Sequence, residues 1–220
     1  SGAMIFDWEA VETQEKEAAP IKWRGDVRDT GLEVKIEPNK DGPFLVFKSP
    51  DEKRKYLLTG DAGLGIRGKD YSVWDVFDAQ SWEQVAQWRG HVEPDRFAKI
   101  GQMLGALYNW ALIAQENNYP GNAVVQELSR LEYPNLYLNP EGRGEVGFRT
   151  STKTKDLMVT AGLASVRDYD VKINSPHTIE ELRTFVALDG GQMEAQSGCH
   201  DDTVLAAAGY GKPSASTAKV

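Results

Sequence analysis

The first half of the chain alternates apolar and polar residues in the way that β-strands do. Leu32, Val34 and Ile36 alternate with charged residues, and the segment 55–61 is more continuously apolar, as is typical of a central strand. Further strands are predicted at 44–47, 71–77 and 83–88. The three predicted strands 55–61, 71–77 and 83–88 follow one another closely and indicate a meander.

The pattern changes to a helical period at Pro94, after which apolar residues recur every three or four positions. Beyond this helix we expect a short buried strand at 111–116 and a helix at 121–131. The remaining predicted elements are a strand at 136–138, a helix at 155–165, an edge strand near 171–173, a helix from 175 to about 186 and a helix of small residues at 203–210. This order predicts an α/β fold with a mixed sheet.

The N-terminal 30 residues show neither the alternation of a strand nor the three-to-four-residue spacing of a helix. A short apolar segment is followed by the acidic run 12–17 and then by Pro20. We therefore interpret residues 1–30 as a tag remnant, Ser1 to Ala3, and a linker arm. Residues 31–212 are predicted to form one domain, and residues 213–220 a flexible tail.

Composition narrows the class of protein. The 220 residues include 25 Lys and Arg against 33 Asp and Glu, a net charge of −8, which excludes a uniformly basic surface but allows a local basic groove. No apolar run approaches the ~20 residues of a membrane-spanning helix, and we identify no secretory signal. The one cysteine, Cys199, cannot form an internal disulfide, which favours a reducing, cytosol-like compartment.

A glycine-rich segment follows the strand 55–61. Gly63, Gly65 and Gly68 fit a dinucleotide-binding pattern, and Gly63 to Lys69 fits most of a phosphate-binding loop. Both sites need a helix next, whose N-terminus holds the phosphate. Because β-branched and aromatic residues follow instead, and Asp70 stands where the loop needs Ser or Thr, we interpret this segment as a hairpin connection.

Acidic residues occur at the ends of two predicted strands and at the start of a predicted helix: Asp61, Glu116, Asp201 and Asp202. Such positions can converge on one edge of an open α/β sheet. Clustered carboxylates repel one another unless a cation neutralises them, and oxygen ligands without a Cys or His cluster suit Mg²⁺ or Mn²⁺. Two such ions about 3.5–4 Å apart can hydrolyse a phosphodiester. The alternative is that each acid is a surface cap or turn residue.

Three segments carry a resemblance to a known family. They are Leu57 to Gly65 with Asp70, Ala114 to Gly121, and His200 to Ala206. In order and spacing they resemble the nuclease motifs of the large terminase subunits of tailed bacteriophages, and the stretches Gly147 to Thr150 and Glu180 to Phe185 look similar as well. The resemblance covers about residues 31–210, although the proline that often follows the first acid is missing after Asp61.

The resemblance implies a ribonuclease-H-like mixed β-sheet flanked by helices and a C-terminal nuclease domain that cuts concatemeric double-stranded viral DNA during packaging. It implies Asp61, Glu116, Asp201 and Asp202 as metal ligands for one or two Mg²⁺ or Mn²⁺ ions. It also implies that the protein acts in the host cytoplasm during virion assembly. The implied partners are the portal, the small terminase subunit and an N-terminal ATPase domain. The alternatives are a non-catalytic docking module of the motor and another ribonuclease-H-like enzyme, such as a junction resolvase.

One basic cluster lies near the acidic motifs in sequence: Arg143, Arg149, Lys153 and Lys155. Basic side chains on a hairpin suit contacts with DNA phosphates, while a solvated loop is the competing interpretation. His200 adjoins Asp201 and could contact a metal or the scissile phosphate, or serve only as a polar cap.

Overall fold

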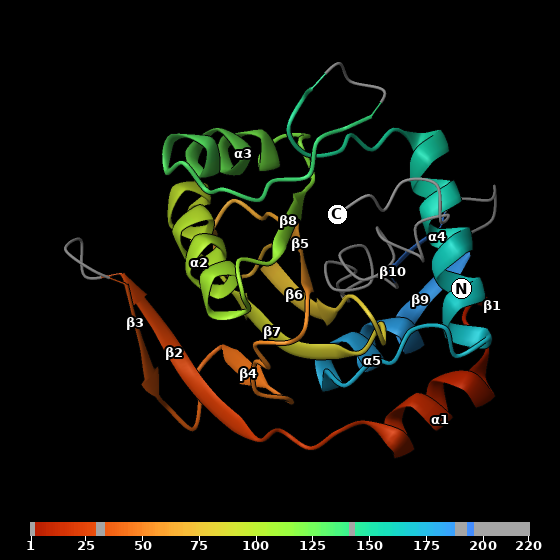
Figure 1. The fold of residues 1–220 in the computed structure, drawn as a ribbon. Helices are drawn as coiled ribbons and strands as arrows, with labels where there is room; N and C mark the ends of the chain where they lie inside the picture. The colour runs from red at the N-terminus through yellow and green to blue at the C-terminus, as the bar shows by residue number, and fades with distance from the viewer. Residues whose placement is uncertain (1–2, 30–33, 141–143, 188–192, 196–220) are drawn as a thin grey trace.

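The computed structural model describes residues 3–29, 34–140, 144–187 and 193–195. Its centre is a seven-stranded sheet in the order β3-β2-β4-β7-β6-β5-β8 (Figure 1). In that order the strands are β3 (Val34–Pro38), β2 (Trp23–Asp29), β4 (Phe44–Val46), β7 (Gln84–Gly90), β6 (Ser72–Asp78), β5 (Tyr56–Asp61) and β8 (Leu112–Gln115). Only the β5–β8 pair is parallel among these strands, so the sheet is mixed.

Helices cover both faces of this sheet (Figure 1). On one face, α2 (Pro94–Leu107) and α3 (Gly121–Arg130) enclose a core around Trp74, whose ring stacks on Phe97 with centroids 4.4 Å apart. A Cβ on Gly101 would lie 2.5 Å from the Trp74 ring, so glycine is what allows α2 to approach the sheet this closely. The other face is covered by α1 (Trp8–Glu17), α4 (Thr152–Arg167) and α5 (Pro176–Thr184).

A second, smaller sheet lies beside the helices of that other face. Its strands are β1 (Ala3–Met4), β9 (Phe185–Ala187) and β10 (Met193–Ala195), with β9 in the middle and antiparallel pairing throughout. Phe185 is fully buried and meets Phe6 edge to face, which joins this sheet to the core under α1 and α5. Of the helices in the described part of the chain, none is both long and apolar enough to span a membrane.

Most of the predicted elements are confirmed. The meander is present as β5, β6 and β7, and the parallel strand β8 lies between α2 and α3 in sequence as expected. The predicted strands at 136–138 and 171–173 are reduced to isolated bridges, such as Ile113 with Leu136 and Glu83 with Lys172. The predicted helix at 203–210 lies outside the described residues.

The segment interpreted as a linker arm contains a helix and a strand that the sequence pattern did not predict. Residues 8–17 form α1, and residues 23–29 form β2 inside the main sheet. Asp7 caps the helix by accepting a hydrogen bond from the backbone N–H of Ala10 at 2.8 Å, and Val11 is fully buried against the core. The helical period was not recognised because most residues of α1 are charged or polar. Only Ala10, Val11 and Gln14 are buried.

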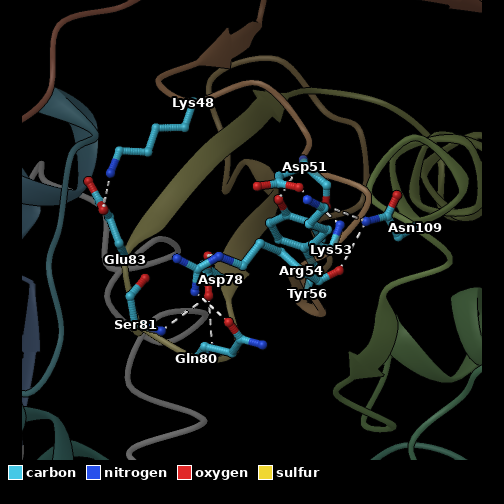
Figure 2. A network of polar contacts seen from close by, with 10 residues as sticks. All are labelled: Lys48, Asp51, Lys53, Arg54, Tyr56, Asp78, Gln80, Ser81, Glu83 and Asn109. Atoms are coloured by element: carbon cyan, nitrogen blue, oxygen red, sulfur yellow. Dashed lines mark hydrogen bonds and ion pairs between the residues drawn. The ribbon is translucent and has the colours of Figure 1, made fainter.

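Two ends of the main sheet can be distinguished. At the end where β5 begins and β6 stops, which we call the opposite end, side chains tie neighbouring strands and loops together (Figure 2). Arg54 pairs with Asp78 at 3.6 Å, and Asn109 donates to the backbone carbonyls of Asp51 and Arg54 at 2.7 and 3.0 Å. Glu83 accepts a hydrogen bond from Lys48 (Figure 2). The other end, where β5 and β8 stop, carries the predicted ligands Asp61 and Glu116 and is called the carboxylate end.

Candidate metal centre

The register of two parallel strands brings two predicted ligands side by side. Gly60 of β5 pairs with Gln115 of β8, so the next step of the same register sets Asp61 beside Glu116. Paired positions on neighbouring strands are about 4.8 Å apart and direct their side chains to the same face. Since Leu58 and Ile113 face the core under α2, Asp61 and Glu116 belong to the face that α5 covers.

Glu116 is oriented by uncharged donors. Its Oε1 accepts hydrogen bonds from the Thr150 hydroxyl and from Asn118 Nδ2, the latter at 2.9 Å. Asn118 Nδ2 also lies 2.6 Å from the Thr150 carbonyl oxygen, which holds the two partners together. Among the described residues, the hydrogen bonds to the Glu116 carboxylate all go to Oε1.

The backbone after β8 is built to hold this arrangement. The N–H of Phe148 donates to the Gln115 carbonyl at 3.1 Å, and the N–H of Asn117 donates to the Phe148 carbonyl at 2.6 Å. The segment carrying Thr150 is thus laid along the end of β8. A Cβ on Gly121 would lie 2.0 Å from the Glu116 carbonyl oxygen, so only glycine allows α3 to start this close to the acid.

The other predicted ligands, Asp201 and Asp202, and His200 beside them, lie outside the described residues. Within the described ranges, no group of three or more His, Cys, Asp or Glu side chains is placed to hold a metal ion. Two of the four predicted carboxylates, Asp61 and Glu116, are therefore the residues next after the last paired positions, Gly60 and Gln115, of two parallel strands.

The predicted basic cluster is only partly described. Arg149 is held by Glu145, with Nε and Nη2 at 2.8 and 2.7 Å from Oε1, and Asn117 donates to the same oxygen at 3.1 Å. Lys153 and Lys155 belong to the first turn of α4, and Arg143 falls outside the described residues. Arg149 would have to exchange an existing ion pair for a DNA phosphate.

The glycine-rich segment connects two antiparallel strands, as predicted. It leads from β5 into β6, so no helix N-terminus follows it. The N–H of Gly63 donates to the hydroxyl of Ser72 at 3.0 Å, and a turn closes between Lys69 N–H and the Ile66 carbonyl at 3.1 Å.

A buried polar network beneath α5 was missed in the sequence. Asp75 of β6 is fully buried, and its Oδ1 accepts hydrogen bonds from Gln84 and Gln87 at 2.6 and 2.9 Å. Gln87 also donates to the Thr178 hydroxyl of α5 at 2.9 Å. Burial raises the pKa of Asp75 to about 7; the two glutamine hydrogen bonds oppose this, and the nearby charge of Glu181 adds to it.

A second feature that was missed is an arginine at the end of β7. Arg89 Nη2 lies 3.1 Å from Glu181 Oε1, and its guanidinium carbon lies 3.5 Å above the centre of the Tyr71 ring. Tyr71 stacks in turn on His91, with centroids 4.0 Å apart. The sequence offered one indication of both features: a charged residue within or next to a predicted strand. Asp75 lies within 71–77, and Arg89 comes just after 83–88.

No model of a known protein family matches the chain. Solved structures do match. The large terminase nuclease of thermophilic phage G20c is 18% identical, with a TM-score of 0.65 over 95% of this chain and 98% of that one. The same nuclease with bound magnesium is 21% identical, with a TM-score of 0.64 over 77% and 87% of the two chains.

The large terminase nuclease domain of Thermus phage P74-26 is 20% identical, with a TM-score of 0.61 over 77% of this chain and 85% of that one. The G20c nuclease has also been crystallised with bound cobalt and with bound zinc. At these identities the likeness establishes the fold. The chain therefore has the ribonuclease-H-like fold of the large terminase nuclease domains, the family that its sequence motifs resemble.

Proposed function

We propose that this chain is a metal-dependent endonuclease that cuts double-stranded viral DNA concatemers during genome packaging. The observation that carries the proposal is the β5–β8 register, whose last pair, Gly60 with Gln115, is followed on the two strands by Asp61 and Glu116, in a fold shared with nucleases crystallised with metal ions. The packaging partners of the proposed enzyme are the portal, the small terminase subunit and an N-terminal ATPase domain.

The donor set fits Mg²⁺ or Mn²⁺. Asp61 and Glu116 offer carboxylate oxygens, and the hydrogen bonds of Thr150 and Asn118 to Oε1 orient the Glu116 carboxylate. We expect Asp201, Asp202 or both to complete the coordination of one or two ions. The bound metal would supply an activated water and neutralise charge on the leaving oxygen. Asp61 and Glu116 would position the ion against the scissile phosphate.

Plasmid nicking tests this proposal. Wild-type protein should nick a supercoiled plasmid with Mn²⁺ or Mg²⁺ and stop when a chelator is added. Asp61→Ala and Glu116→Ala should each lower the rate by at least about 100-fold, because each removes a direct metal ligand. Glu52→Ala changes an exposed acid next to Asp51 at the opposite end and serves as the matched control. Near-normal nicking by either ligand variant would contradict the site.

A thermal shift gives a readout that is independent of cleavage. A metal that binds only the folded protein raises its stability by about 2.7 kcal/mol at 100 times its Kd. Mn²⁺ should therefore raise the melting temperature of the wild type and of Glu52→Ala, but not of Asp61→Ala. A non-catalytic docking module would show neither the shift nor the nicking. A junction resolvase would show both and would prefer a four-way junction over linear duplex in competition.

A further inference from the structure

The connection between β5 and β6 follows directly on a candidate metal ligand. β5 ends at Asp61, and residues 62–71, which we call the glycine loop, lead from there into β6. Asp61 and Glu116 are both half-buried, whereas Thr59, two positions before Asp61 on the same strand, is only 1% exposed. Burial therefore decreases towards the carboxylate end, and both ligand residues are partly exposed to solvent there.

The glycine loop has a defined shape. A Cβ on Gly65 would lie 2.7 Å from the backbone carbonyl carbon of Val92, so the loop packs against the segment that leads into α2. The N–H of Lys69 donates to the carbonyl of Ile66 at 3.1 Å and closes a turn, which we call the loop tip. Gly68 in this turn has a φ of 78°, and a Cβ on it would meet no atom within 4 Å. The loop tip therefore projects into open space.

The loop tip presents two cations and an apolar side chain to solvent. Arg67 and Lys69 are exposed, and neither forms an ion pair within the part of the chain that the structure describes. Ile66 is 52% exposed. At the opposite end, by contrast, Arg54 pairs with Asp78 (Figure 2). An ordered loop with cations of this kind beside an apolar side chain suits a partner that offers negative charge together with apolar surface.

We propose that the loop tip binds backbone phosphates of the duplex that is cut at Asp61 and Glu116. Arg67 and Lys69 bind the phosphates, and Ile66 packs against the deoxyribose. This inference rests on the proposed function. Duplex DNA combines the two properties required, because its phosphates line the edges of the grooves and its sugars lie between them. The duplex then approaches the candidate ligands from the carboxylate end and does not need the face of the sheet that α5 covers.

The length of the loop places the tip close to the cleavage position. Lys69 is four residues from Val73, which pairs with Asp61. At about 3.6 Å per extended residue, the Cα of Lys69 lies within about 14 Å of the Cα of Val73. The strand pairing adds about 5 Å to reach Asp61. Since each DNA strand carries a phosphate every ~3.4 Å along the axis, Lys69 falls within about six phosphates of the one that is cut.

The loop tip is better prepared for phosphate than the basic segment around Arg149. Arg149 is engaged by Glu145 through two nitrogen atoms, so a phosphate would have to displace a carboxylate. Arg67 has no such competitor among the described residues. Its planar guanidinium can donate two parallel hydrogen bonds to a phosphate, and the neighbouring lysine adds a second charge.

Salt dependence of DNA binding tests the loop tip. Binding of a fluorescent duplex of about 20 base pairs is measured by anisotropy in chelator over a series of KCl concentrations. The test variant is Arg67→Gln/Lys69→Gln. The control is Lys53→Gln/Lys55→Gln, which removes two exposed cations with the same spacing from the loop before β5, at the opposite end. Both variants change the net charge equally, so only a local contact distinguishes them.

The log–log slope falls by about 0.9 for each phosphate that is no longer bound, so the test variant should lose about 1.8. The control should keep the wild-type slope, and so should Arg67→Lys, which retains both charges. Ile66→Ser should lower the affinity several-fold at an unchanged slope, because an apolar contact releases no counterions. Leu107→Ser changes an exposed leucine at the end of α2 and should not affect the affinity.

Equal slopes in the two double variants, with native melting temperatures, would overturn the proposal, because DNA binding would then depend at most on overall charge. A wild type that shows no measurable duplex binding at the lowest salt concentration would overturn it as well. The exposed loop tip would in that case serve a partner other than DNA.

Failure of this proposal and failure of the proposed function give different results. If nicking requires Asp61 but Arg67→Gln/Lys69→Gln keeps the wild-type slope, the nuclease assignment stands and the loop tip does not bind the DNA. If that double variant loses slope while the wild type nicks no DNA with Mg²⁺ or Mn²⁺, the loop tip binds DNA and the nuclease assignment fails.

Discussion

Two glutamates at opposite ends of the main sheet have different surroundings. Glu83 precedes β7 at the opposite end, where it pairs with Lys48 and, at 3.5 Å, with Lys172. Burial alone would raise the pKa of Glu83, but the hydrogen bonds from Lys48 and Asn174 and the charge of Lys172 outweigh burial and lower it. Glu116 at the carboxylate end is held by the neutral donors Thr150 and Asn118.

This difference separates a structural acid from a candidate ligand. An acid whose charge is matched by a lysine stabilises the fold and has little reason to bind a metal. An acid that is oriented by neutral donors keeps its full negative charge for a cation. Arginine is present at the carboxylate end as well, but Arg89 is paired with Glu181 of α5 rather than with Glu116.

The largest expected effect concerns that buried pair. Arg89→Ala should lower the free energy of unfolding by about 3–5 kcal/mol, because it leaves the buried Glu181 carboxylate without its cation. Arg54→Ala breaks the pair with Asp78 at the opposite end, where the arginine is 40% exposed, and should cost less than about 1 kcal/mol. Urea unfolding measures both.

A second substitution shows whether the unpaired charge is the cause. Adding Glu181→Gln to Arg89→Ala should recover part of the lost stability, because the remaining partner is then neutral. Equal losses in Arg89→Ala and Arg54→Ala would remove the contrast between a buried and an exposed pair.

Asp75 should make stability depend on pH. Its pKa of about 7 in the folded protein lies above the ordinary value of 3.8, so folding favours the protonated form. The stabilisation is complete below about pH 4 and is lost as the pH rises towards 7. At 1.36 kcal/mol per unit, the wild type should lose about 2–3 kcal/mol between pH 5 and pH 7 relative to Asp75→Asn.

The measurement is urea unfolding of both proteins at pH 5 and pH 7. A pH-independent difference between them would show that the Asp75 carboxyl does not take up a proton on folding. Asp78→Asn serves as the comparison variant in this measurement. Asp78 is the second aspartate of β6, and its Oδ1 accepts hydrogen bonds from the backbone N–H groups of Gln80 and Ser81 at the opposite end.

The sequence predicted the elements that carry a single strong period. The meander and the strand 111–116 were predictable because apolar runs of strand length end at a turn or a charge; Asp61 ends β5, and Glu116 directly follows β8. Helix α1 was not, since only three of its ten residues are buried and most of the others are charged or polar. Its burial depends on α5 and β9, which lie more than 150 residues away in the chain.

The site could be predicted only in part for a similar reason. That Asp61 and Glu116 end neighbouring strands follows from the pattern, but that they share a register step follows from the β5–β8 pairing. The position of Arg89 relative to Asp61 follows from two further strand pairings, Asp61 with Val73 and Val73 with Arg89. No local sequence pattern encodes these pairings. Thr150 reaches Glu116 from 34 positions away, beyond α3 and a stretch paired through isolated bridges at Leu136, Leu138 and Phe148.

A smaller effect is expected from Asn109 at the opposite end. Its backbone is left-handed, with a φ of 58°, and its side chain donates to the carbonyls of Asp51 and Arg54. Asn109→Ala should cost about 1–2 kcal/mol, since it loses these bonds and disfavours the backbone conformation. Asn109→Gly should cost less because glycine accepts that φ. Thermal unfolding measures both, and plasmid nicking should stay at the wild-type rate.

The smallest effect on stability is expected at Asp61. In chelator, Asp61→Ala should change the free energy of unfolding by less than about 0.5 kcal/mol, or raise it, because one of two neighbouring carboxylates is removed and their repulsion is relieved. Thermal unfolding of the metal-free protein measures this. A loss above about 1 kcal/mol would mean that Asp61 stabilises the turn after β5 as Asp78 does at the opposite end. The carboxylate end would then be a structural feature of the fold, and a loss of nicking in Asp61→Ala would no longer identify a metal ligand.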